Sequence, residues 1–221
     1  MTAIASSPVF RPPRQFANGA EWLAALGDVP LDRIIFDPWP GTATETDLLR
    51  LIERDKHLCE LIDGTLVEKP VGSVEAIIAF RLGGLLMAFA DKHDLGVVSG
   101  ADTPLRMKSG RVRLPDVVFF SKERFPKNLK PILALAPDLV VEVLSEGNTV
   151  AEMDQKRAEY FQSGTRLVWI IDPRPRTVAV YHHPGEPTTV LNEQSTLDGE
   201  QVLPGLEIAV ADLFRNVPRG E

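Results

Sequence analysis

The segment DLVVEVLS, residues 138–145, decides the expected fold. Its near-continuous apolar run is typical of a strand that is buried on both faces of a sheet. A helical pattern follows at residues 149–164, with Thr149 as the expected N-cap and Gly164 as the stop. The next two apolar runs, LVWIID (167–172) and VAVYHH (178–183), are expected strands. This strand–helix–strand order predicts at least one pair of parallel strands at the centre of the sheet.

Working outward from this segment, the remaining patterns are mixed. Residues 59–70 (CELIDGTLVEKP) indicate a hairpin around Asp63-Gly64, and two strand patterns, 97–107 and 111–121, lie on either side of Ser109-Gly110. The longest helical pattern covers 74–96, with its apolar period at 77, 78, 82, 85, 86 and 89. Shorter helices are expected at 20–29 and 46–56, and a final hairpin with a short helix at 188–214. We therefore predict one α/β domain over 21–221, with a mixed sheet flanked by helices, and an N-terminal arm over 1–20.

Composition narrows the class of protein. The 221 residues include one cysteine, Cys59, so no intrachain disulfide can form, which suits a reducing compartment. We found no apolar stretch of signal-peptide length and none near the roughly 20 residues of a membrane span. The expectation is a soluble cytoplasmic protein with no membrane partner. The net charge of −7 argues against non-specific attraction to a polyanion, although local fields can differ from the average.

Two carboxylates carry the chemistry that the sequence suggests. Glu142 lies between valines in the expected central strand, where a buried carboxylate needs a cationic partner, a metal ion or a proton. A structural salt bridge was the equal alternative. Asp116 follows Pro115 at the start of an apolar run, so it should lie at the beginning or the kink of a strand, where a turn-capping role was the alternative. On neighbouring strands, the two would form a hard oxygen pair suited to Mg²⁺ or Mn²⁺.

A lysine on the following helix completes the set. Met153, Lys156 and Tyr160 are spaced so that they share one helix face, which we expect to face the core. Lys156 would then point along the edge of the sheet. Near two carboxylates its ammonium group could orient a water nucleophile or stabilise developing phosphate charge. For the helix taken alone, a solvated lysine is the better explanation of Lys156.

These motifs resemble a known family. The runs PDVVFF and APDLVVEVLSEGNT, and the spacing K-x-x-x-Y-x-x-x-G-x-x-L-V-W-I-I-D-P, are similar to the Uma-two family, restriction-endonuclease-like proteins of the PD-(D/E)XK nuclease superfamily. ELIDGTLVEKP and LPGLEIAVADLF resemble it too, so the similarity covers about residues 45–214. The resemblance implies a restriction-endonuclease-like fold and metal-dependent hydrolysis of nucleic acid.

The resemblance also implies roles for individual residues. Asp116 matches the family's Pro-Asp aspartate and Glu142 its second acidic ligand. The superfamily's lysine, two residues after that acid, is here Leu144, which is a departure. Lys156 matches the lysine of the family's K-x-x-x-Y segment and resembles a migrated catalytic lysine.

Further positions are weaker matches. Glu75 corresponds to an acidic position that some superfamily members use as an extra metal ligand, and Glu60 to the family's E-L-I-D-G glutamate. A surface helix glutamate and a strand-edge glutamate were the structural alternatives. Basic residues before and after Asp116 could contact phosphates or form a solvated loop; they are Arg106, Lys108, Arg111, Arg113, Lys122, Arg124, Lys127 and Lys130.

The resulting hypothesis is an Mg²⁺- or Mn²⁺-dependent endonuclease acting on nucleic acid, with DNA as the expected substrate. Asp116, Glu142 and Glu75 would hold the metal, with Lys156 as the catalytic cation. Cleavage of a duplex would favour a homodimer. The sequence leaves two alternatives open. One is a catalytically inactive nuclease-fold module that binds nucleic acid or protein, which Leu144 supports. The other is an unrelated enzyme that uses Glu142 and Lys156 for acid–base chemistry.

Overall fold

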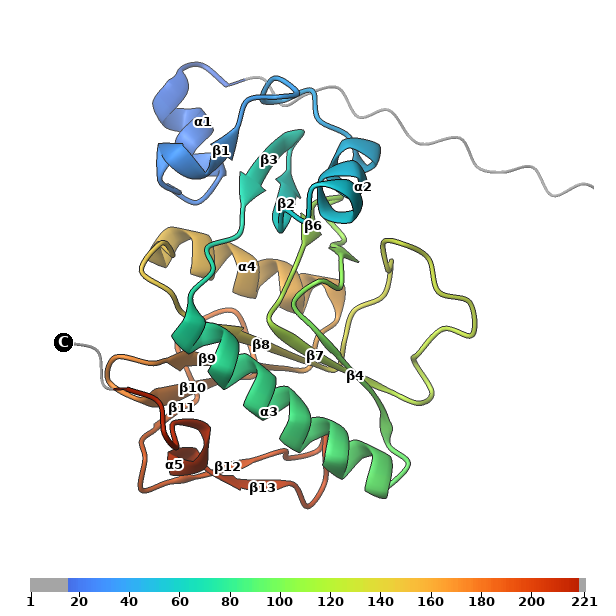
Figure 1. Cartoon of the computed structure of the whole chain (residues 1–221), viewed down its shortest axis with the longest axis vertical. Coiled ribbons are helices and arrows are strands. Elements are labelled where there is room, and N and C mark those ends of the chain that lie inside the picture. The colour runs from blue at the N-terminus through green and yellow to red at the C-terminus, as the bar shows by residue number, and fades with distance from the viewer. Residues whose placement is uncertain (1–15, 219–221) are drawn as a thin grey trace, which may run out of the picture.

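The structure, a computed structural model, describes residues 16–218. Within this range it has two lobes (Figure 1), each built around its own sheet. The smaller lobe, at the top of Figure 1, holds the following elements: α1 (Gly19–Ala25), a 3-10 turn (Leu31–Arg33), β1 (Ile34–Ile35), α2 (Glu45–Arg54), β2 (Cys59–Ile62), β3 (Thr65–Glu68), β5 (Leu105–Arg106) and β6 (Val112–Arg113). The larger lobe holds α3 (Ser73–Lys92), β4 (Gly96–Gly100), β7 (Val117–Ser121), β8 (Leu139–Val143), α4 (Val150–Ser163), β9 (Leu167–Asp172), β10 (Thr177–Tyr181), β11 (Thr189–Leu191), β12 (Thr196–Asp198), β13 (Glu207–Ala209) and α5 (Val210–Leu213).

The larger sheet has the strand order β11-β10-β9-β8-β7-β4. Strands β8 and β9 run parallel, as the segment 138–145 predicted, and the neighbouring pairs along the sheet are antiparallel. The mixed α/β fold is therefore confirmed. Strand β8 lies in the interior of this sheet, and all five of its residues are buried.

The alternation of side chains along β8 assigns each residue to one face of the sheet. Leu139 and Val141 pack in the same apolar cluster as the inward residues of α3, while Val140 packs with Met153 and Tyr160 of α4. Successive side chains of a strand point to opposite faces. Glu142 therefore points to the face that α4 covers, and the local sequence already places it opposite the helix that carries Lys156.

The smaller sheet has the strand order β1-β3-β2-β6-β5. It contains the expected hairpin as the pair β2–β3. Asp63 and Gly64 join β2 and β3 with φ values of 48° and 77°. Both are left-handed, as a type I′ turn requires. Helix α2 starts with a capping box between Thr44 and Asp47 and buries Leu48 against this sheet. The ends of α4 are also as predicted, with Thr149 capping its first turn and Gly164 ending it at φ 108°.

The segment 96–121 differs from the two long strands that the sequence predicted. Each pattern is split between the two sheets: β4 pairs with β7 in the larger sheet, and β5 pairs with β6 in the smaller one. Within this segment the chain crosses between the lobes twice, and the Pro115-Asp116 dipeptide stands at the second of these two crossings, between β6 and β7. This crossing places Asp116 where the lobes meet.

Helix α3 corrects two expectations. Ile78, Leu82 and Leu86 are buried as the helical period predicted, but Ile77 and Leu85 are 44% and 39% exposed. We also expected no stretch suited to a membrane span, and this was wrong, because α3 is long and apolar enough by length and composition to cross one. Its inward residues pack on the larger sheet, as in the core helix of a globular protein.

The predicted N-terminal arm is partly outside the described residues. Helix α1 begins at Gly19, inside the segment assigned to the arm, with Asn18 as its N-cap. The rest of that prediction, residues 1–15, lies outside the part of the chain that the structure describes.

Candidate active site

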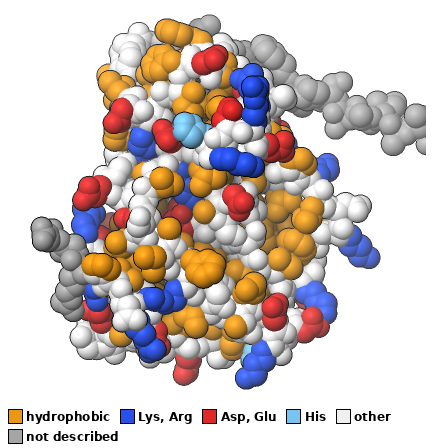
Figure 2. Space-filling view, viewed as in Figure 1, with side chains coloured by type: hydrophobic (Ala, Val, Ile, Leu, Met, Phe, Trp, Pro, Cys, Tyr) orange, Lys and Arg blue, Asp and Glu red, His pale blue; other side chains and the backbone are white. Residues whose placement is uncertain are grey.

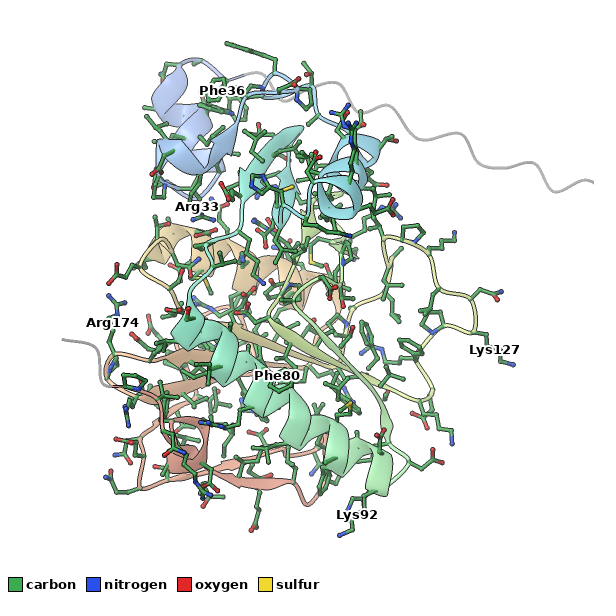
Figure 3. All side chains as sticks on the ribbon, viewed as in Figure 1. Arg33, Phe36, Phe80, Lys92, Lys127 and Arg174 are labelled. Carbon is green, nitrogen blue, oxygen red and sulfur yellow. The ribbon has the colours of Figure 1, made fainter. Side chains whose placement is uncertain are left out.

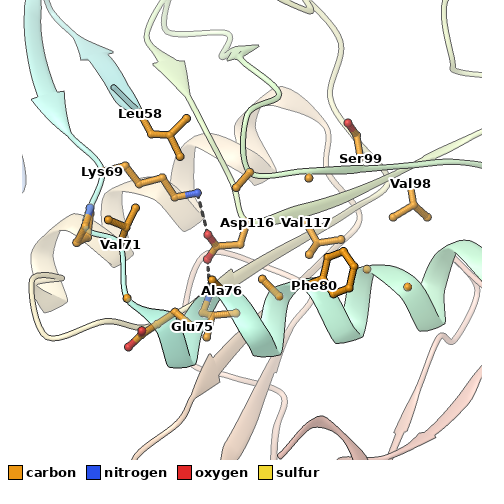
Figure 4. Close-up of a pocket in the computed structure, with 18 of the residues that line it drawn as sticks. Leu58, Lys69, Val71, Glu75, Ala76, Phe80, Val98, Ser99, Asp116 and Val117 are labelled. Carbon is orange, nitrogen blue, oxygen red and sulfur yellow. Dashed lines mark hydrogen bonds and ion pairs between the residues drawn. The ribbon is translucent and has the colours of Figure 1, made fainter. Parts of the chain in front are cut away.

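Asp116 is held at the junction of the two lobes by three interactions. Its backbone N–H donates to the carbonyl of Val141 at 3.1 Å, and its Oδ2 accepts from the N–H of Val143 at 2.7 Å. Its Oδ1 lies 2.8 Å from the ammonium nitrogen of Lys69 (Figure 4). The position before β7 matches the prediction from Pro115. The carboxylate is only partly buried, so one side remains open to a ligand.

Glu142 lies next to Asp116 on the neighbouring strand and is almost fully buried. Its Oε1 accepts a short hydrogen bond from the Tyr160 hydroxyl and lies 3.4 Å from the ammonium nitrogen of Lys156. Burial raises the pKa of Glu142, and the negative charge of Asp116 raises it further, against the lowering effect of Lys156. The two carboxylates are therefore close enough to repel each other. Within residues 16–218, both of these contacts are made by Oε1.

Lys156 is buried between two carboxylates. Its ammonium nitrogen lies 2.9 Å from Oε1 of Glu60, closer than to Glu142. Burial alone would lower the pKa of Lys156, but Glu142 and Glu60 raise it above its usual value, so the group is charged. Burial would raise the pKa of Glu60, but Lys156 and Arg113 lower it to about 2. Glu60 is thus ionised and paired with Lys156, and this pairing compensates for the burial of its charge.

The ion pairs continue from Glu60 across the lobe boundary. Arg113, which is fully buried, bonds Oε2 of Glu60 at 2.8 Å and Oε2 of Glu159 at 2.8 Å. Arg111 extends the chain from Glu159 to Asp63 of the hairpin. Strands β2 and β6 of the smaller lobe are thereby tied to α4 of the larger one. We call this set of Glu142, Lys156, Glu60, Arg113, Glu159 and Arg111 the buried charge network.

Five of the eight basic residues around Asp116 are paired with carboxylates within the fold, and their contact with phosphates stays a prediction. Arg111 and Arg113 belong to the buried charge network, and Arg106 makes two hydrogen bonds to Glu45. Lys122 pairs with Asp94 and Arg124 with Asp138. These side chains are already satisfied within the fold. Their spacing in the sequence did not show this, because each partner is at least 14 residues away.

A cleft of 410 Å³ opens beside Asp116, between the first turns of α3 and the ends of β4 and β7. Asp116, Lys69 and Glu75 line one end of it (Figure 4). Glu142 and Lys156 are not among the residues that line it. Of the two carboxylates, Asp116 therefore lines the cleft, while Glu142 belongs to the buried charge network next to it.

Glu75 lies on the first turn of α3, at the mouth of the cleft. Its Oε2 is 1.9 Å from the position that a Cβ on Gly72 would occupy, so the carboxylate is folded over the N-cap of its own helix. In Figure 4 it points away from Asp116. The structure thus brings Asp116, Glu142, Lys156 and Glu60 together and leaves Glu75 at the edge of the group.

Comparison with known families identifies the family of this chain. The profile of the Uma2 family, described as "Putative restriction endonuclease", matches residues 46–211, which is more than half of the chain. The chain belongs to the Uma2 family. The matched range contains both carboxylates, Glu60 and Lys156. No curated protein matched the chain.

Solved structures place the Uma2 chain in the same fold as a known protein. A crystal structure described as a putative nuclease belonging to DUF820, from Anabaena variabilis, superposes with a TM-score of 0.64 at 21% identity. The match covers 71% of this chain and 89% of the other. At this identity the similarity establishes the nuclease-like fold, and it leaves the roles of individual residues to the geometry.

The donor set of the Uma2 site suits a hard divalent cation. In residues 16–218 no group of three or more His, Cys, Asp or Glu side chains is arranged to hold a metal. Two converging carboxylates are present instead. Mg²⁺ is commonly bound through one or two carboxylates, with water and substrate phosphate completing its coordination. Asp116 and Glu142 fit this pattern, whereas a closed, all-protein metal cage does not.

Two residues of the site were not identified from the sequence. Lys69, which pairs with Asp116 and donates to the carbonyl of Leu114 at 2.6 Å, stands 47 positions before its carboxylate partner. Tyr160 was expected only as a core side chain, yet its hydroxyl binds Glu142. The signal for Tyr160 was available, because a buried tyrosine hydroxyl needs a hydrogen-bond partner. No local pattern pointed to Lys69.

Proposed function

We propose that this Uma2 protein is a divalent-metal-dependent endonuclease that hydrolyses phosphodiester bonds of DNA in the cytoplasm. The observation that carries the proposal is the pair of Asp116 and Glu142, held beside a cleft with its charges only partly compensated. The pKa of Glu142 is raised by burial and by Asp116, so a bound cation would be favoured there. The family and the nuclease-like fold support the same reaction class.

Asp116 and Glu142 would be the residues that hold Mg²⁺ or Mn²⁺. When bound, such an ion neutralises phosphate charge and lowers the pKa of a coordinated water. Lys69 occupies Oδ1 of Asp116 and would have to turn away, which frees its ammonium group to meet a phosphate oxygen in the cleft. Glu75 would join the site only by leaving Gly72.

Lys156 supplies the second positive charge of the site. Glu60 and Glu142 fix its ammonium nitrogen at 2.9 and 3.4 Å. From there it would hold Glu142 in position and stabilise negative charge that develops next to it. This assignment accounts for the absence of a lysine at position 144. Glu142 points from β8 toward α4, and α4 carries the cationic Lys156 on that face. Lys156 is therefore proposed as the functional replacement for the lysine that the strand lacks.

A plasmid-nicking assay tests the proposal. Supercoiled DNA should be nicked in the presence of Mg²⁺ or Mn²⁺ and not with chelator. Asp116→Asn should reduce the rate by roughly a hundredfold, the upper end of the loss caused by removing even an outer-shell partner of a metal ligand. Asp91→Asn, an exposed aspartate near the far end of α3, is the matched control and should cut at the wild-type rate. Equal nicking by wild type and Asp116→Asn would mean that the activity belongs to a contaminant.

A second candidate is a nuclease-fold module that binds nucleic acid or protein without cutting it. The ion pair of Lys69 with Asp116 favours this candidate, because it satisfies the carboxylate without a metal. Metal binding without any nicking would support it.

If the protein cuts both strands of duplex DNA, we also expect it to be a homodimer. Light scattering of the purified protein during size-exclusion chromatography would detect the dimer.

A further inference from the structure

The cleft beside Asp116 has a polar end and a long apolar remainder. Apart from Lys69, Glu75, Asp116 and Ser99, its side chains carry no polar atoms; the others are Leu58, Pro70, Val71, Ala76, Ala79, Phe80, Met87, Val98, Ala101, Val117, Val143 and glycines. A cleft that serves only a phosphate and a metal ion would not need these walls. The volume of 410 Å³ falls in the range of sites for small organic groups.

Phe80 dominates the apolar part. It is 86% exposed, and its ring stands on α3 near the middle of the face shown in Figure 3. Figure 2, viewed from the same side, shows hydrophobic side chains over the middle of this face. Figure 4 shows the ring on the same side of α3 as Val117 and Val98, along the cleft from Asp116. Phe80 contributes little to the core, so core packing does not explain why an aromatic side chain stands at this position.

Glycines keep the cleft open. Gly83 and Gly84 are consecutive in the interior of α3, where glycine is less favourable than alanine. A Cβ on Gly84 or on Gly100 would meet no atom within 4 Å, and a Cβ on Gly83 would make only ordinary contact with Val117 at 3.8 Å. The fold thus has room for side chains at these positions and does not carry them. What the glycines preserve is the free volume beside Phe80.

We propose that the cleft binds one unstacked base of a single-stranded nucleic acid, with its ring on Phe80 and its phosphate at the Asp116–Lys69 end. This inference rests on the proposed function and names the form of the substrate. A base presents a flat π-face that stacks on aromatic side chains whatever the sequence, and this needs apolar walls. In a duplex the bases stack on one another, so the cleft selects a single strand, a gap or a flap.

The charges around the cleft support the same occupant. Lys69 is the one cationic side chain that lines it within the described residues, and α3 presents apolar side chains between Glu75 and Asp91, interrupted by Arg81. Arg81 is partly buried and donates to the carbonyl of Leu213 at 2.9 Å. A surface that tracks many duplex phosphates needs several free cations. Affinity here must come from stacking, so it should depend only weakly on salt.

Binding of a fluorescein-labelled ten-nucleotide single strand and of the matching duplex, followed by anisotropy in chelator to prevent cutting, tests this inference. Wild type should bind the single strand more tightly than the duplex. Phe80→Ala should weaken single-strand binding by roughly 5- to 150-fold, the contribution of one stacked base, and Phe80→Trp should restore it. Phe36→Ala is the matched control, because Phe36 is a 52% exposed phenylalanine on the other lobe (Figure 3), and it should bind as wild type does.

A blocking variant checks the same site without removing the aromatic ring. Gly84→Leu fills the open volume beside Phe80 and favours the helix, so it should fold and should lose single-strand binding. Gly84→Ala leaves most of the space and should retain it. Loss of binding in both variants to the same degree would overturn the inference, because the cleft would not be distinguishing their sizes.

Other outcomes would overturn the inference while leaving the proposed function standing. Unchanged binding in Phe80→Ala, with plasmid nicking intact, would mean that the enzyme cuts DNA without stacking a base there. A wild-type dimer that Phe80→Ala converts to monomer would assign the apolar face of α3 to self-association, and Phe80-dependent sedimentation with phosphatidylcholine vesicles would assign it to a lipid surface. Phe80-dependent single-strand binding without metal-dependent cutting would instead support the inference and reject the proposed nuclease activity.

Discussion

Replacing Glu60 by glutamine tests the buried charge network most quantitatively. The substitution keeps the shape of the side chain and removes the charge that pairs with Lys156 and Arg113. The pKa of Glu60 is lowered from 4.5 to about 2 in the folded protein, although burial opposes this. A difference of about 2.5 pKa units, at about 1.36 kcal/mol per unit, corresponds to roughly 3 kcal/mol of folding free energy at pH 7. The free energy of unfolding of Glu60→Gln should be lower than that of wild type by about this amount.

The pH dependence gives this prediction its sign. A carboxyl group whose pKa is lowered by folding stabilises the native state above its unfolded-state pKa of 4.5, and the contribution disappears as the pH falls toward about 2. The difference in the free energy of unfolding between wild type and Glu60→Gln should therefore be nearly constant from pH 7 to about 5. It should shrink to roughly 2 kcal/mol near pH 3.5.

Urea unfolding followed by tryptophan fluorescence measures this difference, because Trp169 is fully buried and reports the core. Glu53→Gln, at an exposed position of α2, is the matched control and should change the free energy of unfolding by less than about 0.5 kcal/mol. A Glu60→Gln difference that is absent, or that is the same at pH 7 and pH 3.5, would refute the argument that Glu60 is ionised and paired in the buried charge network.

Two further predictions concern the neighbours of Glu60. Lys156→Met should reduce the cleavage rate by about a hundredfold or more and leave the Mn²⁺ affinity nearly unchanged, because it removes a cation and no metal ligand. Cleavage at the wild-type rate by a folded Lys156→Met protein would reject Lys156 as the replacement for the missing strand lysine. Glu142→Gln should match or exceed wild-type stability in chelator, because burial and Asp116 raise the pKa of Glu142 and make its charged form unfavourable at neutral pH. A loss of more than about 3 kcal/mol in that variant, by urea unfolding at pH 7, would make Glu142 a structural ion-pair member instead.

The parts of the fold that the sequence predicted are those with strong local signals. Asp63-Gly64 set the hairpin by its left-handed φ values, and Thr149 and Gly164 marked both ends of α4. The apolar run around Glu142 identified the buried strand, and the helix spacing placed Lys156 on the inward face. In each case the physical cause acts within a few residues, so it can be read without knowing the rest of the structure.

What the sequence did not reveal depends on contacts between distant segments. Lys69 meets Asp116 because the chain passes between the lobes after β3 and again after β6. Arg113 is buried because Glu60 and Glu159 converge on it. Likewise, the helical period of α3 marks an apolar stripe but does not say how wide a face the sheet covers. Phe80 is left exposed because the sheet contacts only the narrower stripe of Ile78, Leu82 and Leu86.

The central claim is that Asp116 and Glu142 together hold one divalent cation. Isothermal titration of Mn²⁺ into wild type, Asp116→Asn and Glu142→Gln tests it most directly, without depending on the substrate. The account predicts one ion per chain for wild type, and a loss of binding in each variant by about tenfold or more, the effect of removing or weakening a ligand. Binding of the same stoichiometry and affinity in all three proteins, or no binding to wild type, would contradict it.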